Sequence, residues 1–149
     1  MKISIPGLEI AALGLGDPSS QKRVLALHGW IDNSASHSFT APALAARGYY
    51  VVCVDFPGHG RSSHRSQADT YGAGGYALSI GDVITSLGWN RFGICAHSMG
   101  AGVGSMLAGA LRDRVAWLAV LDGIGMNAPV SGQHRVCTFI AHPSLRVEM

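Results

Sequence analysis

The sequence is organised around one stretch, R-F-G-I-C-A-H-S-M-G-A-G-V-G, which runs from Arg91 to Gly104. Its first part is continuously apolar from residue 92 to residue 96, as expected for a buried strand. Its second part is rich in small residues and predicts a helix over 98–111. Ser98 stands between the two, at the apex of a sharp turn from strand to helix.

A serine at such a turn is typical of a nucleophile elbow, whose pattern is G-x-S-x-G. The turn is strained, and the close crossing of strand and helix leaves no room for side chains at the two flanking positions. Here these positions are Ala96 and Gly100. Alanine is a modest departure that the same steric argument tolerates. Because a serine hydroxyl is a weak nucleophile, the elbow must hold it clear of the sheet, where a base can reach it.

The rest of the chain alternates apolar runs with helical patterns. Strands are predicted over 22–27, 49–56, 90–97 and 115–121, and helices over 39–47, 75–87 and 98–111. A hairpin over 2–5 and 8–13 turns at Pro6-Gly7. This alternation predicts an α/β fold with a mostly parallel sheet and helices on both faces. The core is expected over 1–125, followed by an atypical tail over 126–149 in which 136–140 is a possible short strand.

Sites in such sheets form at the carboxyl ends of the strands. Four polar signals fall there: the H-G-W of residues 28–30, Asp55, Ser98 and Asp122. Their common position at one edge is the strongest positional argument in the sequence.

Composition excludes several classes of protein. Of the 149 residues only 13% are charged, against about 25% in typical soluble domains, and 48% are hydrophobic. This profile suits a buried parallel sheet and not a disordered chain or a coiled coil. The net charge of +2 gives no reason to expect a nucleic-acid or anionic-membrane partner. No apolar run approaches the ~20 residues of a membrane span, and no clear signal peptide is present, so a cytoplasmic location is expected.

The three cysteines, Cys53, Cys95 and Cys137, form an odd set without metal-ligand spacing. We interpret them as buried, reduced thiols. The seven histidines also lack a ligand spacing such as H-x-H or H-E-x-x-H. No metal and no cofactor is expected.

Three motifs in order resemble the α/β-hydrolase fold family: H-G-W at 28–30, D-F-P-G-H-G-R-S at 55–62 and A-H-S-M-G at 96–100. More narrowly, the stretches 27–36 and 87–100 resemble the serine hydrolase-like proteins. The resemblance covers roughly residues 1–125. It implies Ser98 as nucleophile, with the backbone N–H groups of Trp30 and Met99 as oxyanion-hole donors. A small ester-like acyl substrate would follow.

Each polar residue near the elbow also has a structural interpretation. His97 is expected to pack and form hydrogen bonds, with its side chain pointing away from the serine. His28 resembles the family's loop-bracing histidine, and Asp55 is expected to stabilise the turn after its strand. His59 and His64 are interpreted as a turn residue and a solvated loop residue.

A serine triad also needs an acid and a histidine, which in this family follow the serine in that order. Asp122 is a possible acid, although the more common family position makes it a rim residue. His134 and His142 are the only histidines in the right order, and no convincing last strand precedes either.

Each further strand-helix step needs about 30 residues, and 27 residues follow Asp122. The resemblance therefore implies that the last strands and the cap are missing, and that the tail comes from a truncation, a frameshift or an alternative splice. The strand 115–121 would then expose an apolar edge and favour self-association. Two function classes stay open: a serine hydrolase, or a non-catalytic truncated paralogue or gene-model fragment with at most a binding role.

Overall fold

The computed structural model describes residues 1–66, 71–123 and 135–139, the last as backbone only. The strands are β1 (Lys2–Ile5), β2 (Leu8–Leu15), β3 (Arg23–Leu27), β4 (Tyr50–Val54), β5 (Phe92–His97), β6 (Val115–Leu121) and β7 (Arg135–Phe139). The helices are the 3₁₀ turn η1 (Ser34–His37), α1 (Thr40–Ala45), α2 (Ala73–Ser86) and α3 (Met99–Ala110).

The strands form one seven-stranded sheet in the order β1-β2-β4-β3-β5-β6-β7. The pairs β1–β2 and β2–β4 are antiparallel, and the remaining neighbours, from β4 through β7, are parallel. The predicted fold class, a mostly parallel α/β sheet preceded by a hairpin, is confirmed. In a parallel sheet of this kind the carboxyl ends of β3, β4, β5 and β6 share one edge.

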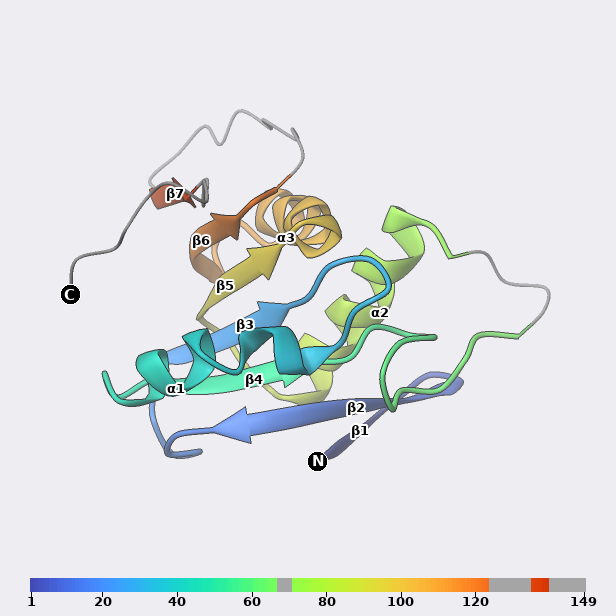
Figure 1. Cartoon of the computed structure of the whole chain (residues 1–149), viewed down its shortest axis with the longest axis horizontal. Coiled ribbons are helices and arrows are strands. Elements are labelled where there is room, and N and C mark those ends of the chain that lie inside the picture. Colours follow the sequence, from blue (N-terminus) through green and yellow to red (C-terminus); the bar gives the residue numbers. More distant parts are fainter. Residues whose placement is uncertain (67–70, 124–134, 140–149) are drawn as a thin grey trace.

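Helices cover both faces of the sheet, with α2 and α3 on one face and α1 with η1 on the other (Figure 1). The larger apolar cluster lies under α2 and α3 and includes Phe56, Ile80, Ile94 and Val103. The smaller cluster lies under α1 and includes Ala41, Cys53 and Cys95. The central strands β3, β4 and β5 are almost wholly buried. They therefore give the rigid base from which the edge loops project.

The sheet continues beyond β6. Residues 135–139 form β7, which pairs in parallel with β6 in the register Trp117↔Arg135 to Leu121↔Phe139. The expectation that the 115–121 strand forms an exposed edge is therefore wrong. The physical reason is that the connection through residues 122–134 is long enough for a parallel crossover, which needs only about a dozen residues.

Helix α2 is present as predicted, but one of its large apolar side chains faces the solvent. Leu78 is 75% exposed. The buried face consists of Tyr76, Ser79, Ile80, Val83 and Ile84. The aromatic and polar members of that face, Tyr76 and Ser79, are less obvious from hydrophobicity alone.

Candidate active site

Ser98 lies at the junction of β5 and α3, in a conformation that L-amino acids rarely adopt. Its backbone has φ 49° and ψ −114°. Its N–H donates to the carbonyl of Leu121 (3.2 Å) and its carbonyl accepts from Ala101 (3.0 Å), so both flanking elements hold the turn. Such strain persists only where the surrounding structure fixes it, and it is concentrated at functional sites.

The three non-glycine residues with positive φ among the described part of the chain are Ile31, Ser98 and Asp122. Each follows a strand that ends at the same edge of the sheet. For a β-branched residue such as Ile31, at φ 53°, this conformation is a genuine outlier. Backbone strain is thus concentrated at the carboxyl edge, where the sequence placed the site.

Gly100 explains why α3 can cross so close to β3. A β-carbon placed on it would lie 2.5 Å from the carbonyl oxygen of His28 and 2.7 Å from that of Leu27. Two residues before the serine, the side chain of Ala96 is fully buried. A β-carbon added to Gly104 would lie 3.4 Å from the Ala96 methyl group. The methyl group of Ala96 therefore fits between β5 and α3, because the α3 residue that faces it is Gly104.

The loop after β3 lies directly against the elbow. A β-carbon on Gly29 would be 3.3 Å from Cβ of Ser98 and 3.0 Å from Nδ1 of His97. The backbone N–H groups of Trp30 and Met99 donate to no group among the described residues. The indole of Trp30 is 56% exposed. The structure thus places the Gly29-Trp30 segment next to Ser98, and the oxyanion-hole role of Trp30 and Met99 stays a prediction.

His28 is fully buried and links this loop to the end of β4. Its Nε2 accepts a hydrogen bond from the Phe56 N–H (3.0 Å), so its Nδ1 carries the proton and donates to the Gly29 carbonyl (2.7 Å). Both ring nitrogens are therefore engaged, and His28 cannot act as the base. Its interpretation as a loop-bracing residue is confirmed.

Asp55 joins two loops that are far apart in sequence. Its Oδ1 accepts from the Ser34 N–H (2.7 Å) and its Oδ2 from the Arg61 N–H (2.9 Å). Its backbone carbonyl accepts from the Ser62 hydroxyl (2.7 Å). With 4% of its surface exposed, Asp55 is a structural residue, as predicted, and it fixes the loop that carries Trp30.

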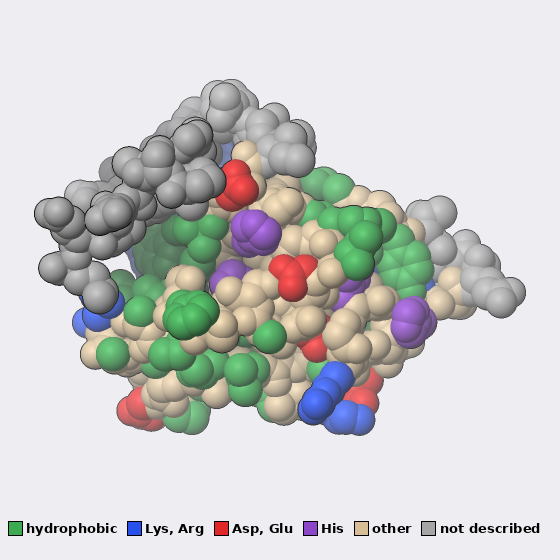
Figure 2. Space-filling model, viewed as in Figure 1, with side chains coloured by type: hydrophobic (Ala, Val, Ile, Leu, Met, Phe, Trp, Pro, Cys, Tyr) green, Lys and Arg blue, Asp and Glu red, His purple; other side chains and the backbone are tan. Residues whose placement is uncertain are grey.

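His37 and His97 are associated on the α1 side of the sheet. His37 is buried, bonds the Leu27 carbonyl and interacts electrostatically with both His97 and Asp32. One nitrogen of each ring, Nε2 of His37 and Nδ1 of His97, is buried without a partner. The ring of His97 lies against Gly29, and the Ser98 hydroxyl makes no hydrogen bond with any described residue. The contact with Gly29 supports the expected packing role of His97, whereas its buried Nδ1 makes no hydrogen bond with a described residue. On the view of Figure 2, histidine and acidic side chains gather near the middle of the molecule.

The candidate acid and bases are less well placed. Asp122 follows β6, next to the elbow strand, with φ 44° and an exposed side chain. It makes no hydrogen bond or ion pair with the described residues. His134 and His142 lie outside the described residues. The structure therefore brings Ser98 and the loop after β3 together, and the roles of nucleophile, oxyanion donors and triad partners stay predictions.

His59 lies in a turn, as predicted, and its ring also contacts aromatic residues near Ser98. Its Nδ1 donates to the Pro57 carbonyl (3.1 Å), and its ring packs edge-on against Trp30 with centroids 5.7 Å apart. It also contacts His28 and Tyr76. His59 therefore supports the indole beside the elbow. No spacing in the sequence indicates this contact, because it joins two loops of different strands.

The two described cysteines, Cys53 and Cys95, are buried and free. Burial raises the pKa of Cys53 to about 12 and that of Cys95 to about 11. Both stay protonated near neutral pH and are poor nucleophiles. Among the residues that the structure describes, no group of three or more His, Cys, Asp or Glu side chains is arranged to hold a metal ion.

Stability is expected to fall as the pH is lowered below about 6.5. Desolvation lowers the pKa of His28 and of His37, so the unfolded chain binds protons at a higher pH than the folded chain. A proton on Nε2 of His28 would also face the Phe56 N–H. Each histidine can remove up to about 1.4 kcal/mol per pH unit between the unfolded and the folded pKa. Urea unfolding at pH 7.5, 6.5 and 5.5 measures this loss.

His37→Gln is expected to reduce that pH dependence, because it removes one of the two buried imidazoles. His64→Asn, which changes an exposed loop histidine, is the matched control and is expected to leave it unchanged. Equal pH dependence in the wild-type chain and in His37→Gln would contradict the assignment to His37.

The fold and the elbow define a class of protein, and comparison with known families agrees. Residues 22–134 match the model of the alpha/beta hydrolase fold. The chain therefore belongs to the alpha/beta hydrolase fold family.

Among individual proteins, the chain is similar to a serine hydrolase-like protein of Dictyostelium discoideum, with 37% identity over 89% of this chain and 37% of the relative. It is also similar to a human serine hydrolase-like protein, with 38% identity over 82% of this chain and 59% of the relative. It thus spans less than two thirds of either relative.

The chain is also similar in fold to solved structures. A hypothetical protein of Pseudomonas aeruginosa superposes with a TM-score of 0.78 and 48% identity, over 83% of this chain and 43% of the other. The thioesterase domain of the curacin biosynthetic pathway has a TM-score of 0.77 and 29% identity, over 83% and 45% of the two chains. Within the described part of this chain, no helix has the length and apolar character to cross a membrane.

Proposed function

We propose that this chain carries the nucleophile and the oxyanion-hole donors of a serine hydrolase that cleaves a small ester or related acyl substrate. The observation that carries the proposal is the strained backbone of Ser98 at the β5–α3 junction. This geometry lifts a hydroxyl above the carboxyl edge of the sheet, where acyl substrates meet α/β-hydrolase serines. The thioesterase neighbour supports acyl chemistry on this arrangement.

In the proposed reaction, Oγ of Ser98 forms a bond to the acyl carbon while its proton passes to a base. Negative charge develops on the substrate oxygen, and the N–H groups of Trp30 and Met99 stabilise it. Collapse of the tetrahedral intermediate breaks the bond to the leaving alcohol, which takes up the proton. Water then releases the acid from the acyl-enzyme. Loss of one oxyanion donor from a complete site costs about 10²–10³ in turnover.

The acid and base of this mechanism are open. Asp122 is the candidate acid, because it follows the strand adjacent to the elbow strand. His134 and His142 are the candidate bases by chain order. No described histidine bonds the Ser98 hydroxyl, and this observation supports the second hypothesis, a non-catalytic truncated paralogue or gene-model fragment with at most a binding role.

Hydrolysis of p-nitrophenyl acetate by the purified chain, compared with the Ser98→Ala variant, decides between the two. A serine hydrolase is expected to release p-nitrophenol at a rate that the variant loses at least about 100-fold. A cooperative thermal transition in both proteins shows that they are folded. Equal rates in the two folded proteins would contradict the role of Ser98, and absence of turnover in both would favour the binding hypothesis.

A further inference from the structure

A pocket lies away from Ser98, on the face of the sheet that carries η1. It has a volume of about 970 Å³. It is formed by the β1–β2 hairpin, the loop before η1 and the turn after β4, with the lining residues Met1, Lys2, Ala11, Ala12, Leu13, Asn33, Ser34, Ala35, Asp55, Gly60 and Arg61. None of these residues belongs to the elbow or contributes an oxyanion donor. The pocket is therefore separate from the candidate active site.

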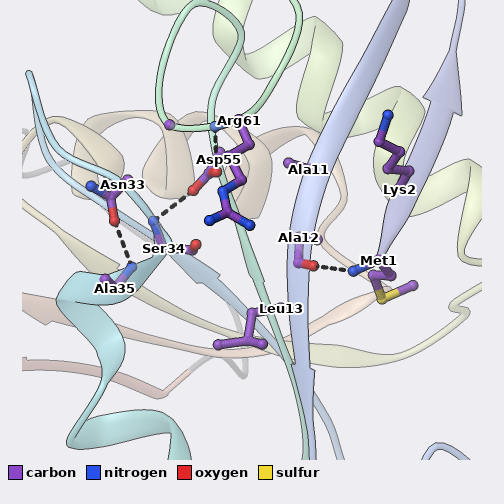
Figure 3. A pocket seen from close by; sticks show the side chains of 11 residues that line it. Met1, Lys2, Ala11, Ala12, Leu13, Asn33, Ser34, Ala35, Asp55 and Arg61 are labelled. Carbon is purple, nitrogen blue, oxygen red and sulfur yellow. Dashed lines mark hydrogen bonds between the residues drawn. The ribbon is translucent and has the colours of Figure 1, made fainter.

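Arg61 provides the pocket with a cation that has no partner among the described residues. The turn holds its backbone, because the Arg61 N–H donates to Oδ2 of Asp55 (2.9 Å) and Gly60 (φ 53°) is pressed against the same carboxylate. The guanidinium extends toward the space between Ser34 and β2 (Figure 3). It makes no hydrogen bond or ion pair with any described residue. An arginine keeps its charge at all relevant pH values.

The other charged groups of the pocket already have partners, and among them the N-terminal ammonium of Met1 donates to the Ala12 carbonyl (2.6 Å). Both oxygens of Asp55 accept backbone N–H groups, from Ser34 and Arg61, and the carboxylate is almost fully buried. Lys2 pairs with Glu9 across the hairpin. The hydroxyl of Ser34 has no partner among the described residues. One wall of the pocket therefore offers hydrogen-bond donors to a ligand.

The opposite wall, on the β1–β2 hairpin, carries most of the apolar surface of the pocket. It is formed by alanines 11 and 12, Leu13 and the side chain of Met1, and 51% of the Leu13 surface is exposed. A ligand that covered Leu13 while reaching Arg61 would gain both apolar burial and a charge-assisted hydrogen bond. The pocket thus favours a molecule with one anionic end and one apolar end.

We infer that this pocket binds a small amphiphilic carboxylate, with the carboxylate on Arg61 and Ser34 and the apolar body against Leu13. The planar guanidinium fork matches a carboxylate in a bidentate geometry. A carboxylate suits the pocket better than a phosphate monoester, which carries close to two negative charges. The second charge would lie near the Asp55 carboxylate, and the N-terminal ammonium of Met1, another cation at the pocket, already donates to the Ala12 carbonyl (2.6 Å).

Isothermal titration calorimetry with octanoate tests the inference, with 1-octanol and octyl phosphate as probes of the same chain length. Octanoate is expected to bind more tightly than either. Arg61→Gln is expected to weaken octanoate at least about tenfold, which is the usual loss for one charge-assisted hydrogen bond. Arg47→Gln, the same change at an exposed arginine outside the pocket, is the matched control and is expected to bind as the wild type does.

Amide NMR spectra locate the ligand. Octanoate is expected to shift the signals of Leu13, Ser34 and Arg61 and to leave those of Ser98 and Met99 in place. Shifts confined to the elbow, equal binding by Arg61→Gln and wild type, or equal or tighter binding of octanol or octyl phosphate would each overturn the inference. Far-UV circular dichroism of each variant confirms that it is folded.

Discussion

Ser98→Gly is expected to abolish labelling by a fluorophosphonate and at the same time to stabilise the fold. The label needs the hydroxyl, which glycine lacks. The backbone at φ 49° and ψ −114° costs a non-glycine residue about 1–3 kcal/mol, and glycine adopts positive φ freely. Glycine loses about 0.5–1 kcal/mol more in chain entropy on folding. We therefore expect a net gain of about 1 kcal/mol in the free energy of unfolding.

Ser98 is well suited to this test because its side chain caps no helix, so the variant loses no capping hydrogen bond. Ser98→Ala separates the two effects: it removes the nucleophile and keeps the strain, and we expect no label and nearly unchanged stability. Ser105→Gly is the matched control in the interior of α3, where the same change is expected to destabilise by about 0.5–1 kcal/mol. In-gel fluorescence reports the label and urea unfolding the stability.

A Ser98→Gly protein less stable than Ser98→Ala would contradict the interpretation of the elbow as a strained turn. Labelling that persists in Ser98→Ala would show that the probe reacts with another residue. The two readouts are independent, because backbone strain exists whether or not the chain completes a catalytic triad.

The elbow could be predicted because its signals are local. A continuous apolar run, a serine and small flanking residues occur within 14 consecutive positions, 91–104, and each follows from packing at one crossing. The alternation of strands and helices could be predicted for the same reason, because buried strands and helix-ending glycines are recognised within a few consecutive residues. Gly48, which follows the helix predicted over 39–47, has φ 83°, as expected of a glycine after a helix end.

Features that depend on distant segments could not be predicted. A possible short strand was predicted over 136–140, close to the observed β7, but its pairing with β6 was not, because a typical strand-helix unit needs more residues than follow β6. Asp55 fixes the loop before η1 through Ser34, 21 positions away. His59 supports Trp30 across two loops. These contacts follow from the sheet order, which places the ends of β3, β4 and β5 side by side.

Gly100→Ala is expected to destabilise the fold by at least about 2 kcal/mol and to weaken labelling of Ser98. The added methyl group would lie 2.5 Å from the oxygen of His28 and 2.7 Å from that of Leu27. Both are backbone atoms of the loop and strand that carry Trp30, so neither can rotate away. Overpacking typically costs about 1–3 kcal/mol and occasionally more. The better helix propensity of alanine offsets only part of that cost.

Gly102→Ala is the matched control on the same helix. A β-carbon there would meet nothing within 4 Å, so the change is expected to stabilise by about 0.5–1 kcal/mol. Urea unfolding of the two variants compares the same substitution with and without the close crossing.

Since α3 must move away from β3 to admit a methyl group at position 100, the N–H of Met99 moves away from Trp30 with it. If Gly100→Ala were as stable as Gly102→Ala, α3 would not be held against β3 at this point, and the positions of the two proposed oxyanion donors would no longer be fixed by packing.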